Sequence, residues 1–127
     1  AKGKEIAISM ISAKDVDVFF GNAGQVAVGV REGAAEHTDR YGIAQPSDCL
    51  QENPDLILTS IVTDNVALIS LGLEDWVNGS FGGKVYSAGA AEKVLSYGAF
   101  GNNAKEFEAQ AMDIYNKLAA GEITLTR

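Results

Sequence analysis

Residues 15–30, DVDVFFGNAGQVAVGV, switch from one hydrophobic period to another across a single short turn. The first part is a β-branched and aromatic run that is typical of a buried strand: Val16, Val18, Phe19 and Phe20. Gly21 to Gly24 interrupt this run. Beyond the interruption, apolar residues recur at every fourth position, as on one face of a helix: Val26, Val30 and Ala34. The stretch therefore predicts a strand, a tight turn and a helix.

The turn at residues 21–24 is a candidate ligand site. Ligands of open α/β sheets bind beyond the carboxyl ends of the strands, and the start of the following helix presents N–H groups there. Phe20 ends the strand beside the turn, so its ring could stack on a flat ligand. Two alternatives stay open: the turn is an ordinary connection without a ligand, and Phe20 packs in the core.

The remaining elements alternate between helix and strand, which favours an α/β fold with a mainly parallel sheet. Asp64 or Asn65 is expected to cap the helix that follows, and Asn103 with Glu106 resembles a capping box. Expected helices cover residues 3–13, 24–37 and 65–79, and a last one ends at Gly121; expected strands cover 15–20, 41–44, 56–62 and 85–88, with a short final strand at Ile123 and Leu125.

Composition excludes several classes of function. The net charge of −7 leaves no basic patch for nucleic acid. Cys49 is the single cysteine and His37 the single histidine, so neither a disulfide nor a metal cluster is predicted. No apolar run approaches the ~20 residues of a membrane span, and no signal peptide is visible. Neither a phosphate-binding nor a dinucleotide-binding glycine motif is present, so no cofactor is predicted.

The motif around Phe20 resembles the second-lobe motif of the basic membrane protein (BMP) family, whose members are substrate-binding lipoproteins of ABC transporters, some of them specific for purine nucleosides. The family pattern is roughly A-D-V-I-F-x-x-A-G-G-T-G-x-G-V. Seven positions match, namely Asp17, Val18, Phe20, Ala23, Gly24, Gly29 and Val30, whereas Phe19, Gln25, Val26 and Ala27 differ. Four later stretches resemble family motifs in the same order: Tyr41–Ile43, Leu58–Val62, Asp75–Gly83 and Gly121–Ile123.

This resemblance implies a three-layer αβα domain over residues 1–127, like the second lobe of a type I periplasmic binding protein. Because family members are longer and two-lobed, the chain is expected to be their C-terminal part and to carry half of a cleft. The implied contacts to a small ligand are stacking by Phe20, hydrogen bonds from Asn22 and Gln25, and backbone N–H groups at Ala23 and Gly24. Catalysis is not implied; the implied partner is an ABC permease and the implied location is extracytoplasmic.

Two positions depart from the family pattern. The family's ligand-binding aspartate falls on Ala44 or Gln45, and only an insertion brings Asp48 into its place. Asp48 is then expected either to accept hydrogen bonds from a hydroxylated ligand or to form an Asx turn or helix cap. The family's binding lysine has no clear counterpart, and Lys93 is the nearest candidate.

Two further functional classes remain as alternatives. One is a ligand-sensing or regulatory domain on the same fold, and the other is a small α/β enzyme, for which no nucleophile–base pair is recognisable. The helix at 65–79 carries an apolar stripe of Val66, Ile69, Leu73, Trp76 and Val77. We expect this stripe to fold onto the chain's own sheet or to be buried in a homo-oligomer, with Trp76 covered in either case.

Overall fold

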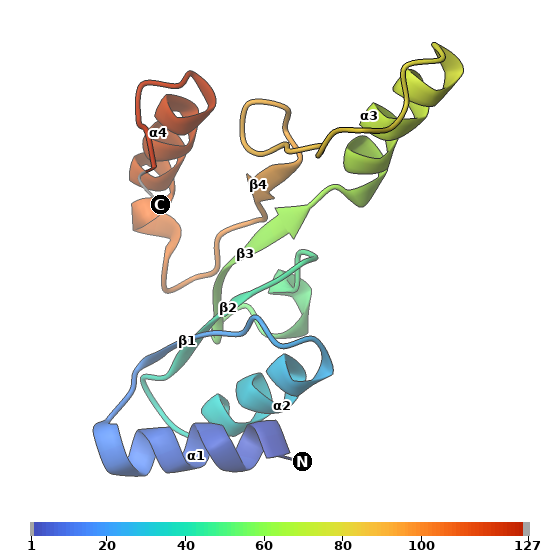
Figure 1. The fold of residues 1–127 in the computed structure, drawn as a ribbon. Coiled ribbons are helices and arrows are strands. Elements are labelled where there is room, and N and C mark those ends of the chain that lie inside the picture. Colours follow the sequence, from blue (N-terminus) through green and yellow to red (C-terminus); the bar gives the residue numbers. More distant parts are fainter. Residues whose placement is uncertain (1, 126–127) are drawn as a thin grey trace. The chain divides into compact units, whose positions relative to one another are not determined.

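The computed structural model describes residues 2–125 (Figure 1). The chain divides into two compact units. Unit 1 contains the residues up to 61 together with 97–108, and unit 2 contains 62–96 together with the residues from 109 onward. The elements in chain order are α1 (Lys2–Lys14), β1 (Val18–Phe20), α2 (Gln25–Ala34), β2 (Tyr41–Ala44), η1 (Leu50–Glu52), β3 (Ile57–Thr63), α3 (Asn65–Val77), β4 (Leu95–Tyr97), η2 (Lys105–Phe107) and α4 (Glu108–Ala119).

The four strands form one sheet in the order β1-β2-β3-β4. Strands β1, β2 and β3 are parallel, with Phe20 opposite Ile43 and Ala44 opposite Ser60. Around β4, the Gly98 N–H donates to the Ser60 carbonyl and the Gly101 N–H to the Leu58 carbonyl. Residue numbers rise on one side of this ladder as they fall on the other, so β4 runs antiparallel to β3. The predicted α/β class with a mainly parallel sheet is confirmed.

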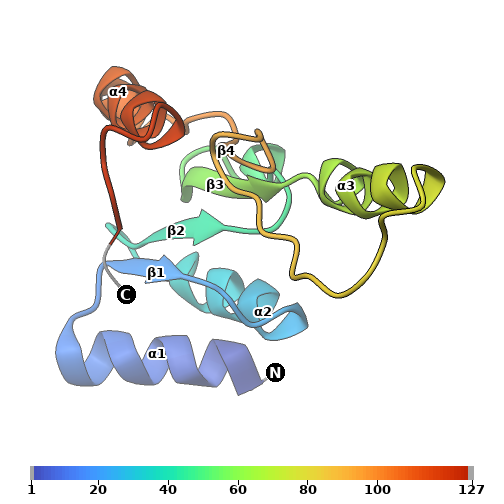
Figure 2. The ribbon, with the colours of Figure 1, turned by 45° about the horizontal axis from the view of Figure 1, so that its top comes forward.

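The core of unit 1 lies between the sheet and the helix pair α1–α2. Phe19 is buried while its neighbours Val18 and Phe20 are exposed, as the alternation of a strand requires. Figure 2 shows α1 and α2 side by side against one face of β1 and β2. Other buried members of this core are Ala7, Ile11, Ala34, Ala44, Leu56 and Ile57.

Glycines let α1 approach α2 closely. A Cβ added at Gly3 would lie 2.2 Å from the Val26 carbonyl oxygen, and one added at Gly33 would lie 2.9 Å from both the Lys4 carbonyl oxygen and the Ala7 Cβ. The two helix backbones are therefore nearly in contact, and side chains larger than hydrogen do not fit at these positions.

In unit 2, α3 begins at a regular cap and its long connection to β4 is held by side chains. Asp64 accepts a hydrogen bond from the Ala67 N–H at 2.9 Å, which confirms the predicted cap. Asp75 accepts hydrogen bonds from the Tyr86 hydroxyl at 2.6 Å and the Ser80 hydroxyl at 3.2 Å, and it pairs with Lys84. The glycine-rich connection is thereby tied back to the end of its helix.

Several predicted elements differ from the structure. Residues 85–88 form no strand, and β4 lies instead at 95–97, where the Tyr115 hydroxyl donates to the Leu95 carbonyl. Within the described range, Ile123 and Leu125 are not in a strand. The predicted capping box does not form: the helical segment η2 has Ala104 as its N-cap without a side-chain cap, and the Asn103 side-chain amide donates to the Asp55 carbonyl.

The expectation for Trp76 is wrong for the chain by itself. Its side chain is 67% exposed, and the other members of the predicted stripe are also more than half exposed. The stripe is thus left uncovered by the described residues of unit 2.

A candidate ligand site at the carboxyl end of β1

The turn after β1 faces solvent at the carboxyl end of its strand. Phe20, the last residue of β1, is 56% exposed, and Asn22, Ala23, Gly24 and Gln25 are all exposed. The predicted position of this turn, with Asn22 and Gln25 accessible, is therefore confirmed.

Two glycines give the turn its shape. A Cβ at Gly21 would lie 2.8 Å from the Ala27 Cβ, so glycine is needed where the turn passes α2. Gly24 has a φ of +52° and serves as the N-cap of α2 without a side-chain cap. This is the left-handed region, which glycine occupies at little cost.

The turn has backbone N–H groups that are available to donate hydrogen bonds to a ligand. The N–H groups of Val26 and Ala27 donate to the carbonyls of Ala23 and Gly24, which satisfies two donors at the start of the helix. The N–H groups of Asn22, Ala23 and Gly24 have no hydrogen-bond partner among residues 2–125. They lie beside the partially positive end of α2, so the turn can donate to an electronegative group of a ligand.

Asp48 lies at the same level of the sheet as the turn, but two strands away. It contacts Ser60, which lies opposite Ala44, one residue beyond the partner of Phe20. Two strand spacings separate β1 from β3 by about 10 Å. Phe20 and Asp48 thus lie at the same edge of the sheet in unit 1, two strands apart.

The Asp48 carboxylate is held by three donors of unit 1. Oδ1 accepts from the Leu50 N–H at 3.1 Å and the Ser60 hydroxyl at 3.4 Å, while Oδ2 accepts from the Ala99 N–H at 2.9 Å. The Ala99 and Leu50 N–H groups and the Ser60 hydroxyl together hold the pKa of Asp48 below its usual value. The bond to Leu50 is the Asx turn considered as the structural alternative, so Asp48 has a structural role whatever else it binds.

Sequence reasoning missed the partners of Asp48. Ser60 is a fully buried hydroxyl in β3, and a buried polar side chain signals a specific hydrogen bond. Gly98 is needed because a Cβ there would lie 2.7 Å from the carboxylate carbon of Asp48. Neither residue carries a motif by which the contact could be recognised in the sequence.

The remaining candidate residues have local partners of their own. Lys93 belongs to unit 2, in a turn closed by its N–H donating to the Ala90 carbonyl. Cys49 is half-buried, and burial raises the pKa of its thiol. Residues 2–125 contain no cluster of three potential metal ligands, and no helix among them is long and apolar enough to cross a membrane.

Replacing Asp48 with alanine is expected to destabilise the protein by about 1–2 kcal/mol at neutral pH, since three donors lose their acceptor and water replaces it only in part. A carboxyl with a lowered folded-state pKa stabilises the fold above its unfolded pKa. That contribution is lost as the pH falls through the lowered pKa that Asp48 has in the folded protein. Urea unfolding at neutral and acidic pH measures both effects, and acidification should cost Asp48→Ala less stability than wild type.

The control for this experiment is Asp113→Ala, which removes only an exposed ion pair to Lys117 four residues along α4. Such pairs contribute about 0.5 kcal/mol or less. If the two alanine variants lose equal stability, or if acidification affects Asp48→Ala as strongly as wild type, Asp48 does not hold the loops as described.

A parallel sheet with an open turn beyond one strand is the arrangement of α/β domains that bind ligands at the sheet edge. A family model described as "Bmp: ABC transporter substrate-binding protein PnrA-like" matches residues 1–127. The chain therefore belongs to the Bmp family of PnrA-like ABC transporter substrate-binding proteins, and the resemblance seen in the sequence is confirmed. No curated protein matches the sequence.

Two solved structures share the fold. ABC transporter system solute-binding proteins from Aeropyrum pernix K1 match with a TM-score of 0.72 and 21% identity, over 98% of this chain and 44% of that one. A transcriptional activator of the comK gene from Bacillus halodurans matches with a TM-score of 0.78 and 19% identity, over 96% of this chain and 43% of the other. The chain thus spans less than half the length of either protein.

Proposed function

We propose that this chain is part of the solute-binding component of an ABC transporter and that it binds a small solute at the turn after β1. The observation that carries the proposal is the exposed Phe20 ring beside N–H groups that have no partner in the described chain, in a member of the Bmp family. A flat, hydroxylated solute such as a purine nucleoside suits this combination of ring and donors.

Each residue of the proposed site has a separate role. Phe20 stacks on the flat part of the solute, while Asn22 and Gln25 hydrogen-bond its edge and the N–H groups of Ala23 and Gly24 donate to its acceptors. Asp48 accepts from a hydroxyl through Oδ2, which has a single donor among residues 2–125 and room for a second. The surface contributes binding and no catalysis.

The proposed mechanism is that of a two-lobed binding protein. The solute lies between two lobes, the lobes close on it, and the closed form delivers it to a membrane permease. The chain would supply one wall of that cleft, at an extracytoplasmic location and on a lipoprotein. A ligand-sensing regulatory domain on the same fold is the alternative, and the family match favours transport.

The test is a titration of the 127-residue chain with adenosine, guanosine and inosine, followed by calorimetry and by NMR of the backbone amides. We expect weak binding, because a missing second wall costs roughly 3–5 kcal/mol. Amide shifts should be concentrated at residues 20–25 and near Asp48. In Phe20→Ala the affinity should fall at least about tenfold, since a stacked ring contributes on the order of 1 kcal/mol beyond its buried area.

The matched control is Phe81→Ala, which removes an equally exposed phenylalanine from unit 2. It should leave nucleoside binding unchanged. Amide shifts that avoid residues 20–25, or equal losses in the two variants, would contradict the site. Binding of a different solute at residues 20–25 would keep the site and exclude the nucleoside.

The chain is also proposed to form a homo-oligomer, because α3 carries large apolar side chains that the described chain leaves uncovered.

A further inference from the structure

Gly98 lies directly against the carboxylate of Asp48. A Cβ added at Gly98 would lie 2.7 Å from Cγ, 2.9 Å from Oδ1 and 3.0 Å from Oδ2 of Asp48, and these are its three nearest atoms. The φ of Gly98 lies outside the left-handed region, so the backbone conformation does not itself require glycine. Glycine is needed here for space, and the group that fills the space is the Asp48 carboxylate.

The backbone of Gly98 is fixed, so the carboxylate would have to move if a side chain were added. The Gly98 N–H donates to the Ser60 carbonyl at 2.8 Å, and the neighbouring Ala99 N–H donates to Asp48 Oδ2 at 2.9 Å. The first bond holds the chain on β3, whereas Asp48 reaches Gly98 with the end of a side chain that can rotate. A methyl group at Gly98 should therefore turn the carboxylate away and leave the bond to β3 intact.

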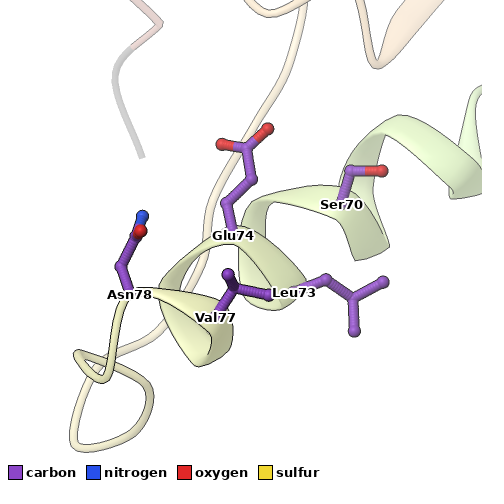
Figure 3. A pocket seen from close by; sticks show the side chains of 5 residues that line it. All are labelled: Ser70, Leu73, Glu74, Val77 and Asn78. Atoms are coloured by element: carbon purple, nitrogen blue, oxygen red, sulfur yellow. The ribbon is translucent and has the colours of Figure 1, made fainter.

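Asp48 is exposed, yet its carboxylate is held in one orientation by donors of unit 1. Glu74 of unit 2 is the contrasting case: it lines a shallow groove on α3, and its carboxylate accepts no hydrogen bond from residues 2–125 (Figure 3). Fixing a surface side chain costs conformational entropy, and in Asp48 this cost is met before any solute arrives. Asp48 is thus a preorganised acceptor.

One acceptor position of Asp48 remains open. An ionised carboxylate accepts roughly four hydrogen bonds, and the chain supplies three, from Leu50 and Ser60 on Oδ1 and from Ala99 on Oδ2. We infer that Gly98 is a positioning residue for the proposed solute site, because its lack of a side chain keeps Asp48 Oδ2 where it accepts a hydroxyl of the solute. The inference rests on the proposed function and adds a determinant of specificity: Gly98 supports recognition of a sugar hydroxyl, whereas the flat ring is bound elsewhere.

The experiment compares inosine with its base hypoxanthine, which has no sugar hydroxyl, in NMR titrations of the 127-residue chain. In Gly98→Ala the affinity for inosine should fall about tenfold, as expected when a hydrogen bond to a charged group is lost. The affinity for hypoxanthine should not change. In an Asp48→Ala background the same substitution should leave the inosine affinity unchanged, because both residues act through one carboxylate. A role of Gly98 in stability alone would not separate the two solutes.

A second variant tests the carboxylate without altering Gly98. Asp48→Glu lengthens the side chain, so its carboxylate no longer fits the same space, and a selective loss of inosine binding is expected again. The matched control for the added methyl group is Gly72→Ala on α3, where the nearest atom belongs to Phe81 at 3.5 Å. It should leave both affinities unchanged. Without solute, hydrogen exchange of the Ala99 amide should be faster in Gly98→Ala than in wild type, and circular dichroism should show that each variant is folded.

The outcomes separate this inference from the proposed function. If wild type binds inosine and Gly98→Ala lowers both affinities equally, or neither, Gly98 does not position Asp48 for the solute, and the proposed site stands. Unchanged exchange of the Ala99 amide would show that the carboxylate is not displaced and would likewise overturn the inference. If Gly98→Ala does not fold, unchanged inosine binding by Asp48→Glu overturns it. If wild type binds neither solute, the proposed function fails and the inference fails with it.

Discussion

Replacing Gly101 with alanine is expected to destabilise the protein by about 3 kcal/mol or more, the upper end of the range for forced packing. A Cβ at Gly101 would lie 1.9 Å from the Ile57 carbonyl oxygen and 2.8 Å from that of Pro54. These are backbone atoms beside β3, so no side-chain rotation relieves the overlap. The Gly101 N–H also donates to the Leu58 carbonyl at 2.9 Å, and a shift of the chain would break this bond.

Urea unfolding followed by circular dichroism measures the loss, and Gly89→Ala is the control. No atom lies within 4 Å of a Cβ placed at Gly89, and its φ is not in the left-handed region. Its alanine variant should stay within about 0.5 kcal/mol of wild type. If Gly101→Ala were as stable as Gly89→Ala, the close approach of residues 98–101 to β3 would be incorrect.

Gly3→Ala should cost about 2–3 kcal/mol, because the added methyl group would overlap the Val26 carbonyl oxygen at 2.2 Å. In an isolated helix the same change would be favourable by up to ~1 kcal/mol, since alanine is the better helix former. The sign of the effect therefore distinguishes close packing of α1 on α2 from a helix that stands free.

The comparison for this prediction is Gly72→Ala on α3, where the nearest atom is Phe81 Cε2 at an ordinary contact distance of 3.5 Å. This variant should be neutral or more stable than wild type. Thermal melts of the two variants under identical conditions give the comparison. A stabilising effect of Gly3→Ala would show that α1 does not pack on α2 through this glycine.

Helix α1 and strand β2 could be predicted closely from hydrophobic periods, whereas the expected strand at 15–20 forms only over Val18–Phe20 and the expected helix at 24–37 only over Gln25–Ala34. Residues 41–44 were expected as a strand and form β2 with those limits, and the expected helix at 3–13 forms α1 with one further residue at each end. Ile11 of α1 and Ala44 of β2 lie in the same core, whereas Ile6 and Met10 of α1 are exposed, so the apolar spacing locates the elements better than it locates their buried faces. The order of the strands and the antiparallel β4 depend on contacts between distant residues, which no local pattern contains.

The prediction fails where side chains bond across long stretches of sequence. Val85–Ala88 has the composition of a strand, but Tyr86 in this segment is bound to Asp75 and the chain there makes no ladder. Asn103 has the spacing of a capping residue, but the Asp55 carbonyl is a better-placed partner in the folded chain. Local propensity is a weak prior that such tertiary bonds override.

The candidate site likewise combines features that a local sequence pattern predicts with contacts that it does not predict. The turn at 21–25 was predictable because a strand, two glycines and a helix follow one another directly in the sequence. The position of Asp48 was also predictable as a strand end, whereas its three donors come from residues 2, 12 and 51 positions away. Proximity of that kind follows from the topology of the sheet.

The discontinuity of unit 1 has a consequence for the order of folding. Helices α1 and α2 are near neighbours in the chain and can pair early, but the unit also needs residues 97–108, and Ala99 bonds Asp48 across 51 residues. Contacts between such distant positions close large loops and slow the folding reaction. The nascent chain therefore exposes the unpaired hydrogen-bonding edge of β3 until the segment around Gly98 and Gly101 has been synthesised. During that interval the edge can pair with strands of other chains.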